Sequence, residues 1–223
     1  MFGSLIRELH SYDASRRARL PTRCGASKID VLPLVDHRDS VLVVVDAQEG
    51  LYGDRLPAGE GERAREALAR MTWLAKVARQ LAVPAVLTEE DPSRNGATFA
   101  PIAEAFPDAA AVVKPTFGLA GTPEIVGRIE SSGRTTAVLV GFETDVCVAQ
   151  SAIGLKERGM RVIVVEDAVF SPGEMHERGL ARMVAEGVEL NHCKGLAYEW
   201  TRTLERSRSV LQAPEVGEPP FRL

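Results

Sequence analysis

The sequence alternates between short runs of continuous apolar residues and longer segments in which apolar residues recur every three or four positions. The continuous runs are rich in Val, Ile and Leu, which is typical of strands buried on both faces of a sheet. They predict strands at 40–48, 83–90, 111–113, 135–141 and 161–168, with a further short strand near 188–190.

The segments between these runs have the apolar spacing of amphipathic helices. They predict helices at 60–81, 122–133, 145–159, 172–187 and 195–206, and a short helix within the turn-rich segment 89–110. Strands that alternate with helices in this way indicate the α/β class, with a mostly parallel sheet covered by helices on both faces.

The two ends of the chain have a different pattern. Residues 1–38 are rich in Arg and have only short apolar pieces, so we expect an N-terminal arm with one short helix near 3–10. This arm either wraps around a partner subunit or frays, and the sequence favours neither. The regular pattern defines one domain at 39–207, and the Pro-rich residues 208–223 are expected to form an irregular tail.

Composition narrows the classes of protein to which the chain can belong. The 223 residues carry a formal net charge of −4, which argues against a nucleic-acid partner. No apolar run approaches the roughly 18 residues needed to cross a membrane, and the first residues do not resemble a secretory signal.

The three cysteines, Cys24, Cys147 and Cys193, are widely spaced, so we expect no disulfide framework, no zinc site and a reducing cytoplasm. No glycine-rich nucleotide motif follows a strand, and no cofactor is expected.

Chemically reactive side chains follow the predicted strands. In a parallel α/β sheet, ligands bind in the crevice beyond the carboxyl ends of the strands. Asp46 ends the first strand, Lys114 follows the third, and Cys147 comes six residues after Gly141, where the fourth strand ends. The pattern therefore predicts an acid, an amine and a thiol along one edge of the sheet.

Cys147 has two interpretations. A free cysteine is most often a small apolar residue of the core. At this position, however, Thr144 or Asp145 can cap the following helix, which places Cys147 in its first turn. There the helix end would stabilise a thiolate and lower its pKa, and the free N–H groups could bind an oxyanion.

Asp46 and Lys114 also have ordinary interpretations, as a capping carboxylate and as a surface lysine. A carboxylate directly after five apolar residues is partly buried, however, and therefore needs a partner. Lys114 is the natural partner, because it follows a buried run and precedes Pro115, which extends the backbone. Together with Cys147, the pair supplies a base, a cation and a nucleophile.

The stretches "VLVVVDAQEG", "KPTFG" and "GFETDVCVAQSA" resemble, in this order, the three motifs of the isochorismatase-like cysteine hydrolase superfamily. That superfamily includes nicotinamidases and N-carbamoylsarcosine amidases, and the similarity spans 40–206. The resemblance implies a three-layer α/β/α fold with a doubly wound sheet of about six strands. It also implies a catalytic triad of Asp46, Lys114 and Cys147, and a cis peptide bond between Phe142 and Glu143. The backbone N–H groups of Glu143 and Cys147 would then form the oxyanion hole.

The sequence departs from particular members of the superfamily. Nicotinamidases carry a D-x-H metal motif where this chain has Glu90, Asp91 and Pro92, and its four histidines are scattered. A metal site is therefore not expected, and nicotinamide is disfavoured as the substrate. Cys147 also weighs against isochorismate, because true isochorismate hydrolases typically lack the nucleophilic cysteine. The loop after the second predicted strand, "VLTEEDPSRNGAT", resembles instead the divergent isochorismatase-domain proteins.

Further residues are candidates for the pocket wall. Phe117, Gln48 and Thr144 are predicted to bind substrate, although core packing or loop capping would also explain them. Glu89 and Glu90 either face the substrate or are solvated loop carboxylates, and the second interpretation is favoured.

The leading hypothesis is a cysteine-dependent hydrolase that cleaves a small amide, or a related C–N bond, through a thioester intermediate. One alternative is hydrolysis of an ether or ester without a covalent intermediate, with Asp46 as the acid. The other is a non-catalytic binding or scaffold protein with the same fold. In each enzyme hypothesis the partner is a small molecule, with no nucleic acid and no membrane, and the protein is expected to form a homo-oligomer.

Overall fold

The computed structural model describes residues 33–52, 56 and 59–222. Residues 34–223 form one compact unit. The predicted helix near 3–10 and most of the predicted N-terminal arm lie outside the described residues. No helix in the described part of the chain combines the length and the apolar character that a bilayer span requires.

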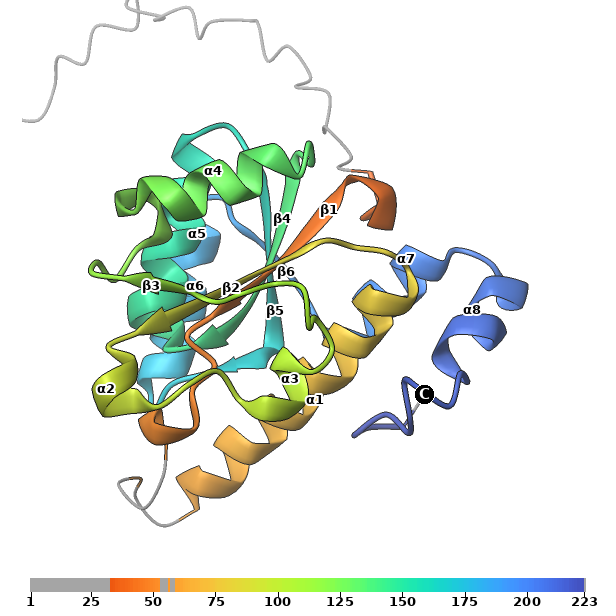
Figure 1. Ribbon diagram of the computed structural model, residues 1–223, viewed down its shortest axis with the longest axis horizontal. Helices are drawn as coiled ribbons and strands as arrows, with labels where there is room; N and C mark the ends of the chain where they lie inside the picture. Colours follow the sequence, from red (N-terminus) through yellow and green to blue (C-terminus); the bar gives the residue numbers. More distant parts are fainter. Residues whose placement is uncertain (1–32, 53–55, 57–58, 223) are drawn as a thin grey trace, which may run out of the picture. The chain divides into compact units, whose positions relative to one another are not determined.

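A single parallel sheet forms the centre of this unit (Figure 1). Its six strands lie in the order β3-β2-β1-β4-β5-β6, and every neighbouring pair is parallel. The prediction of a doubly wound parallel sheet is confirmed. The strands are β1 (Ser40–Val45), β2 (Ala85–Glu90), β3 (Val112–Lys114), β4 (Thr136–Phe142), β5 (Arg161–Phe170) and β6 (Glu189–Asn191).

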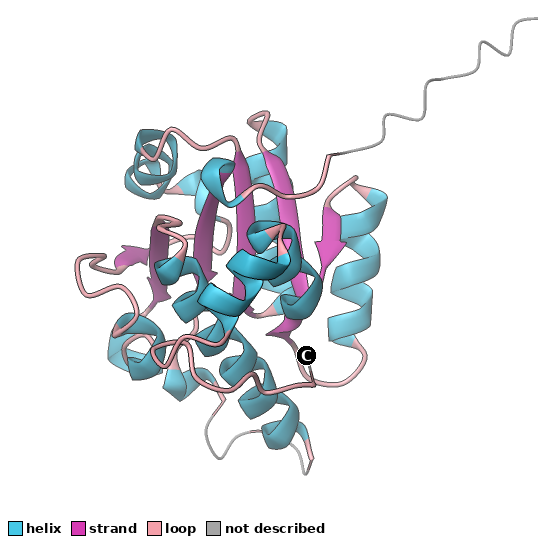
Figure 2. Cartoon of the chain, turned by 90° about the vertical axis from the view of Figure 1, so that its right-hand side faces the viewer, coloured by secondary structure: helices cyan, strands magenta, loops and turns pink. Residues whose placement is uncertain are grey.

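Helices cover both faces of the sheet, as Figures 1 and 2 show. Alternate residues of each strand point to opposite faces and so build two separate cores. On one face Val41 and Val43 pack with α4 (Pro123–Ser131), α5 (Ala149–Glu157) and α6 (Met175–Ala185). On the other face Leu42 and Val44 belong to the core formed with α1 (Glu60–Gln80), α3 (Ala100–Ala103), α7 (Cys193–Thr201) and α8 (Leu204–Leu211).

The remaining helical pieces are short. They are α2 (Pro92–Asn95), three 3₁₀ turns at His37–Asp39, Glu49–Leu51 and Leu119–Gly121, and a π-helical turn at Thr144–Val148. The π-helical turn joins β4 directly to α5, and it carries Cys147.

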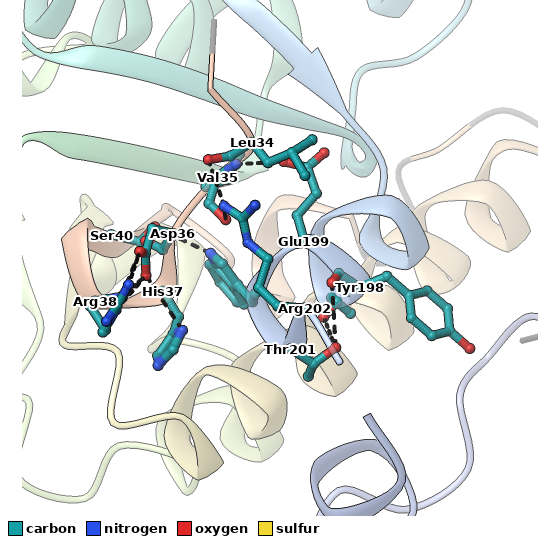
Figure 3. Close-up of polar contacts among 12 residues, drawn as sticks. Leu34, Val35, Asp36, His37, Arg38, Ser40, Tyr198, Glu199, Thr201 and Arg202 are labelled. Atoms are coloured by element: carbon teal, nitrogen blue, oxygen red, sulfur yellow. Dashed lines mark hydrogen bonds and ion pairs between the residues drawn. The ribbon is translucent and has the colours of Figure 1, made fainter. Parts of the chain in front are cut away.

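The first described residues are tied to α7 (Figure 3). The Val35 N–H donates to Glu199 Oε2 at 2.6 Å, and Arg202 Nη2 donates to Val35 O at 3.2 Å. The Trp200 indole N–H, which is buried in the core, donates to Ser40 Oγ at 3.2 Å. These contacts explain why the compact unit already begins at residue 34, ahead of the predicted boundary at 39.

The C-terminal region is more regular than its sequence indicates. The predicted helix at 195–206 is two helices, because the backbone reverses at Arg202, where φ is +64°. A new helix, α8, then begins, with Thr203 Oγ1 accepting a hydrogen bond from the Arg206 N–H. This helix runs to Leu211, beyond the predicted start of an irregular tail, because Val210 and Leu211 are buried in the core.

Candidate active site

The candidate site lies between β1 and β4, where the order in which the chain adds strands to the sheet changes direction. Strand β1 leads to α1 on one face, whereas the neighbouring β4 leads to α5 on the other, and this divergence opens a crevice. Asp46 follows β1, Glu90 ends β2, Lys114 ends β3, and Cys147 lies in the turn after β4. The edge of the sheet therefore brings together residues that are up to 101 positions apart in the printed sequence, from Asp46 to Cys147.

The close contact between β1 and β4 depends on Gly141. This residue has φ of +129°, and a Cβ at its position would overlap the carbonyl group of Val45. Only glycine combines this conformation with such a close backbone approach. Gly141 thus sets the distance between the strand that ends before Asp46 and the strand that leads to Cys147.

Asp46 and Lys114 form a fully buried ion pair. Lys114 Nζ lies 2.7 Å from Asp46 Oδ2, and both side chains are 0% exposed. Thr88 Oγ1 donates to the second carboxylate oxygen, Oδ1, at 2.9 Å, and Lys114 Nζ also donates to Thr116 O at 3.0 Å. Apart from the ion pair, Oδ2 has no hydrogen-bond partner among the described residues. It therefore retains a lone pair that can accept a proton.

Cys147 completes the predicted triad. Lys114 Nζ lies 3.5 Å from Cys147 Sγ, so the ammonium group contacts both the carboxylate and the sulfur. Cys147 Sγ also donates to Glu90 Oε2 at 3.5 Å. A carboxylate oxygen of Asp46, one of Glu90 and the sulfur all lie within 4.8 Å of one another. The three residues that the sequence predicts to act together are thus in contact.

The protonation state of Cys147 differs from the sequence-based expectation. Burial raises the pKa of the thiol, the negative charge of Asp46 raises it further, and Lys114 opposes these effects. The prediction of a lowered pKa is therefore wrong, because it weighed the helix end and not the desolvation of a side chain that is only 4% exposed. The pKa of Asp46 is also raised, chiefly by burial, against the opposing effect of Lys114. The resting form of Cys147 is therefore the thiol.

The turn that carries Cys147 is fixed by its neighbours. The peptide bond between Phe142 and Glu143 is cis, as the family resemblance implies. Thr144 Oγ1 is hydrogen-bonded to His176 Nδ1 at 3.0 Å, and Asp145 Oδ1 accepts a bond from Ser171 Oγ at 2.6 Å. Neither Thr144 nor Asp145 caps the helix, so that prediction is wrong. The fully buried Thr144 hydroxyl is bound to α6, so it is not placed to contact a substrate as predicted.

Gln48 has a different role from the predicted one. Its Nε2 donates to Gly96 O at 2.5 Å, and its Oε1 accepts a bond from the Glu90 N–H at 2.8 Å. The amide is therefore bound at one end to the last residue of β2 and at the other to the loop that follows α2, and the side chain is 0% exposed. Gln48 supports the wall of the site from behind and is not placed to bind a substrate.

A cavity of about 250 Å³ opens onto the thiol. Phe117, which is 53% exposed, belongs to its wall, in agreement with the prediction that it lines the pocket. The full lining consists of Leu51, Glu90, Arg94, Asn95, Phe117, Glu143, Val146 and Cys147.

Glu90 faces the cavity, although the sequence favoured a solvated loop carboxylate at this position. Glu89 and Glu90 are adjacent in β2, and neighbouring strand residues point to opposite faces. Glu89 Oε1 accepts hydrogen bonds from the N–H and the hydroxyl of Thr98, at 2.7 and 2.8 Å, whereas Glu90 contacts Cys147. The signal that could have identified Glu90 is its place at the end of the strand next to β1.

The acidic and sulfur groups of the site could in principle hold a cation. Asp46, Glu90 and Cys147 each offer one ligand atom. The Lys114 ammonium, however, already lies against Asp46 and Cys147 and supplies the positive charge there. A metal ion bound to the same atoms would be in close contact with this buried cation, so the arrangement does not favour a metal site.

Comparisons with known proteins find relatives of this chain. A family model described as the isochorismatase domain matches residues 40–192. "Isochorismatase domain-containing protein 2" of Bos taurus is 30% identical over 142 residues, which cover 60% of this chain and 65% of that protein. The matched region is thus slightly less than two thirds of this relative's length.

Solved structures show the same fold. The YcaC protein of Escherichia coli, described as an octameric hydrolase of unknown specificity, matches with a TM-score of 0.72 and 25% identity over 79% of this chain and 86% of its own. YcaC of Pseudomonas aeruginosa, solved with hexane-2,5-diol and covalent acrylamide, has a TM-score of 0.72 and 26% identity, with coverages of 81% and 89%. The fold, the order of the motifs and the matched family model lead to one conclusion: this chain belongs to the isochorismatase-like hydrolase family.

Proposed function

We propose that this protein is a cysteine hydrolase that cleaves a small amide, or a related C–N bond, through a thioester intermediate. The observation that carries the proposal is the contact of one buried ammonium group with both a carboxylate and a thiol, at the wall of a cavity. A nucleophile, a base and a cation held in contact are the parts that nucleophilic acyl transfer requires.

In the first half of the reaction, Asp46 accepts the proton of Cys147 as the sulfur attacks the carbonyl carbon. Proton transfer during the attack is needed because the raised pKa of Cys147 keeps the resting group a thiol. The new C–S bond creates an oxyanion, which the N–H groups of Glu143 and Cys147 stabilise, since N–H groups at a helix start lack intrahelical acceptors. Asp46 then protonates the leaving amine, and the C–N bond breaks.

In the second half, Asp46 removes a proton from water, which attacks the thioester carbon. The C–S bond breaks, the carboxylic acid leaves, and the proton returns to the sulfur. Lys114 holds Asp46 beside the sulfur through the whole cycle and balances its charge. Without this cation, a carboxylate so deeply buried would lose much of its stability as an anion.

Two further findings support a reactive thiol. The P. aeruginosa YcaC structure is described with covalent acrylamide, a reagent to which thiols add readily. Cys147 also borders a cavity of about 250 Å³, which gives a small molecule access to the sulfur. By analogy with the octameric E. coli YcaC, we also propose that this protein forms a homo-oligomer. Its residence in the cytoplasm remains a prediction.

The test is to trap the intermediate. The protein is mixed with a panel of small amides, quenched in acid during turnover and digested, and the peptide that contains Cys147 is examined by mass spectrometry. We expect the acyl mass on this peptide and none on the peptide that contains Cys193, which serves as the internal control.

The alternatives give different results in the same experiment. Hydrolysis of an ether or ester without a covalent intermediate would leave the amides intact. It would give product without an adduct only from small esters or ethers added to the panel, and this turnover would persist in Cys147→Ala. A scaffold protein would give neither product nor adduct, and Cys147 would react with iodoacetamide as slowly as the fully buried Cys193. Either result would refute the proposed mechanism.

A further inference from the structure

The cavity beside Cys147 contains more negative than positive groups. Glu90 and Glu143 are both half-buried and both line it. Within the described part of the chain, neither carboxylate forms an ion pair with a Lys, Arg or His side chain. A half-buried carboxylate without a cation is costly, so a ligand that supplies positive charge is favoured here.

The positive groups nearby do not compensate these two carboxylates. Lys114 is paired with Asp46 at 2.7 Å, so its charge is already balanced. Arg94 belongs to the cavity wall but is exposed, and water screens its charge. Asp145 adds a further negative charge next to Glu143.

The environment of Glu143 shows the same imbalance. Burial raises the pKa of this carboxyl group, the nearby Tyr52 hydroxyl opposes the shift, and the negative charges of Asp145 and Glu90 raise it further. The groups that shift the pKa of Glu143 include two other carboxylates and no cation. A bound cation would relieve this repulsion.

Building on the proposed function, we propose that the site selects small amides that carry a positively charged amino group. Glu90 and Glu143 bind this group while the amide carbonyl faces Cys147. Glu90 Oε2 lies only 3.5 Å from Cys147 Sγ, so an ammonium group bound to Glu90 lies close to the reacting carbon. The cavity of about 250 Å³ restricts the substrate to a short chain between the two groups.

A first experiment tests charge selection without any turnover. Methanethiosulfonates form a mixed disulfide with a thiolate and release methanesulfinate, so three reagents that differ in charge report on access to one sulfur. We compare the cationic aminoethyl, the neutral methyl and the anionic sulfonatoethyl reagents, and we follow the Cys147 peptide by mass spectrometry. Each rate is divided by the rate of the same reagent with free N-acetylcysteine.

We expect the normalised rate of the cationic reagent to exceed that of the anionic one by about tenfold or more at low salt, with a smaller ratio at high salt. The ratio should fall in Glu90→Gln and in Glu143→Gln. Glu89→Gln is the matched control, because it removes the same charge one residue away from Glu90 on a side chain that does not line the cavity. Equal rates, or faster reaction of the anionic reagent through Arg94, would overturn the proposal.

A second experiment uses turnover and separates the two proposals. β-Alaninamide, butyramide and succinamate are amides of similar size with a positive, a neutral and a negative end. We expect kcat/KM to be highest for β-alaninamide, and the advantage over butyramide to shrink in Glu143→Gln. Equal hydrolysis of all three by the native protein, abolished in Cys147→Ala, would refute charge selection and leave the cysteine hydrolase intact. Hydrolysis that persists in Cys147→Ala would refute the cysteine mechanism, whereas the reagent rates would still decide charge selection.

Discussion

The described part of the chain contains two buried cysteines with similar neighbours, and only one of these two is placed to react. Cys147 lies beside Asp46 and Lys114, and Cys193 lies beside Asp167 and Arg70. Burial together with the neighbouring carboxylate raises the pKa of both thiols. Each cysteine is also near the start of a helical segment.

The difference between them lies in access and in the orientation of the cation. Cys193, the first residue of α7, is 0% exposed and packed in the core, and its sulfur donates to the carbonyl oxygen of Arg70 in α1 at 3.8 Å. The Arg70 guanidinium pairs instead with Asp167, in an ion pair whose side chains are 22% and 30% exposed. At Cys147 the ammonium group faces the sulfur, and a cavity lies in front of it. A thiol that has an acid and a cation as neighbours is therefore not a nucleophile for that reason alone. The cation must also face the sulfur, and a cavity must give a substrate access to it.

The largest expected effect concerns turnover of a small amide. Cys147→Ala should lower kcat/KM by about 10³-fold or more, because it removes the atom that forms the covalent bond. Cys193→Ala should leave kcat/KM within a few-fold of the native value, although the smaller side chain reduces stability. Ammonia release measured on folded protein checks both variants. Similar activities in the two variants would contradict the assignment of Cys147, and not Cys193, as the nucleophile.

The next effect concerns stability. Lys114→Met leaves the Asp46 carboxylate buried without its cation, and we expect the free energy of unfolding to fall by about 3–5 kcal/mol. Arg70→Met breaks a partly exposed pair with Asp167, and the expected loss is about 1 kcal/mol or less. Urea denaturation at neutral pH measures both changes. Equal losses in the two variants would show that burial does not determine how much the Asp46–Lys114 pair contributes to the free energy of unfolding.

A third effect concerns the pH dependence of alkylation. Asp46→Asn removes a negative charge that raises the pKa of Cys147 and leaves Lys114 to stabilise the thiolate. The pKa of Cys147 should therefore fall, and alkylation by iodoacetamide at neutral pH should become several-fold faster even though amide hydrolysis is lost. Asp167→Asn should not accelerate alkylation of Cys193, because that sulfur is reached only through local unfolding. Slower alkylation of Cys147 in Asp46→Asn would contradict the proposed electrostatics.

The smallest effect concerns the hydrogen bond that Thr88 donates to Asp46. Such a bond stabilises the carboxylate and lowers its pKa, so Thr88→Val should raise the pKa of Asp46 by about one unit or less. Because the reaction requires ionised Asp46, the acidic limb of the pH profile of kcat/KM should move to higher pH. Thr88→Ser, which keeps the hydroxyl, is the control and should restore the native profile. If the acidic limb of the Thr88→Val profile moved to lower pH instead, the limb would report the ionisation of a group other than Asp46.

Much of the fold follows from the sequence alone. The continuous apolar runs 41–45 and 162–165 have no polar residue that could face water on either side, so they predict inner strands of a parallel sheet with helices on both faces. The grouping of Asp46, Lys114 and Cys147 follows from one further rule, because parallel strands end at a common edge. Both inferences can be made from the sequence because they depend only on the spacing of apolar residues along the chain and on the common direction of parallel strands.

Only the tertiary structure decided which groups face the cavity and in what state. Glu90 reaches Cys147 while Glu89 turns to Thr98, and the amide of Gln48 and the hydroxyl of Thr144 are bound by neighbouring segments. The α8 helix likewise depends on a core that its own sequence does not reveal. The sequence determined that a thiol lies at the sheet edge, but its raised pKa depends on burial by several distant segments. Desolvation and the distances between charges are properties of the packed molecule, and no single stretch of the chain contains them.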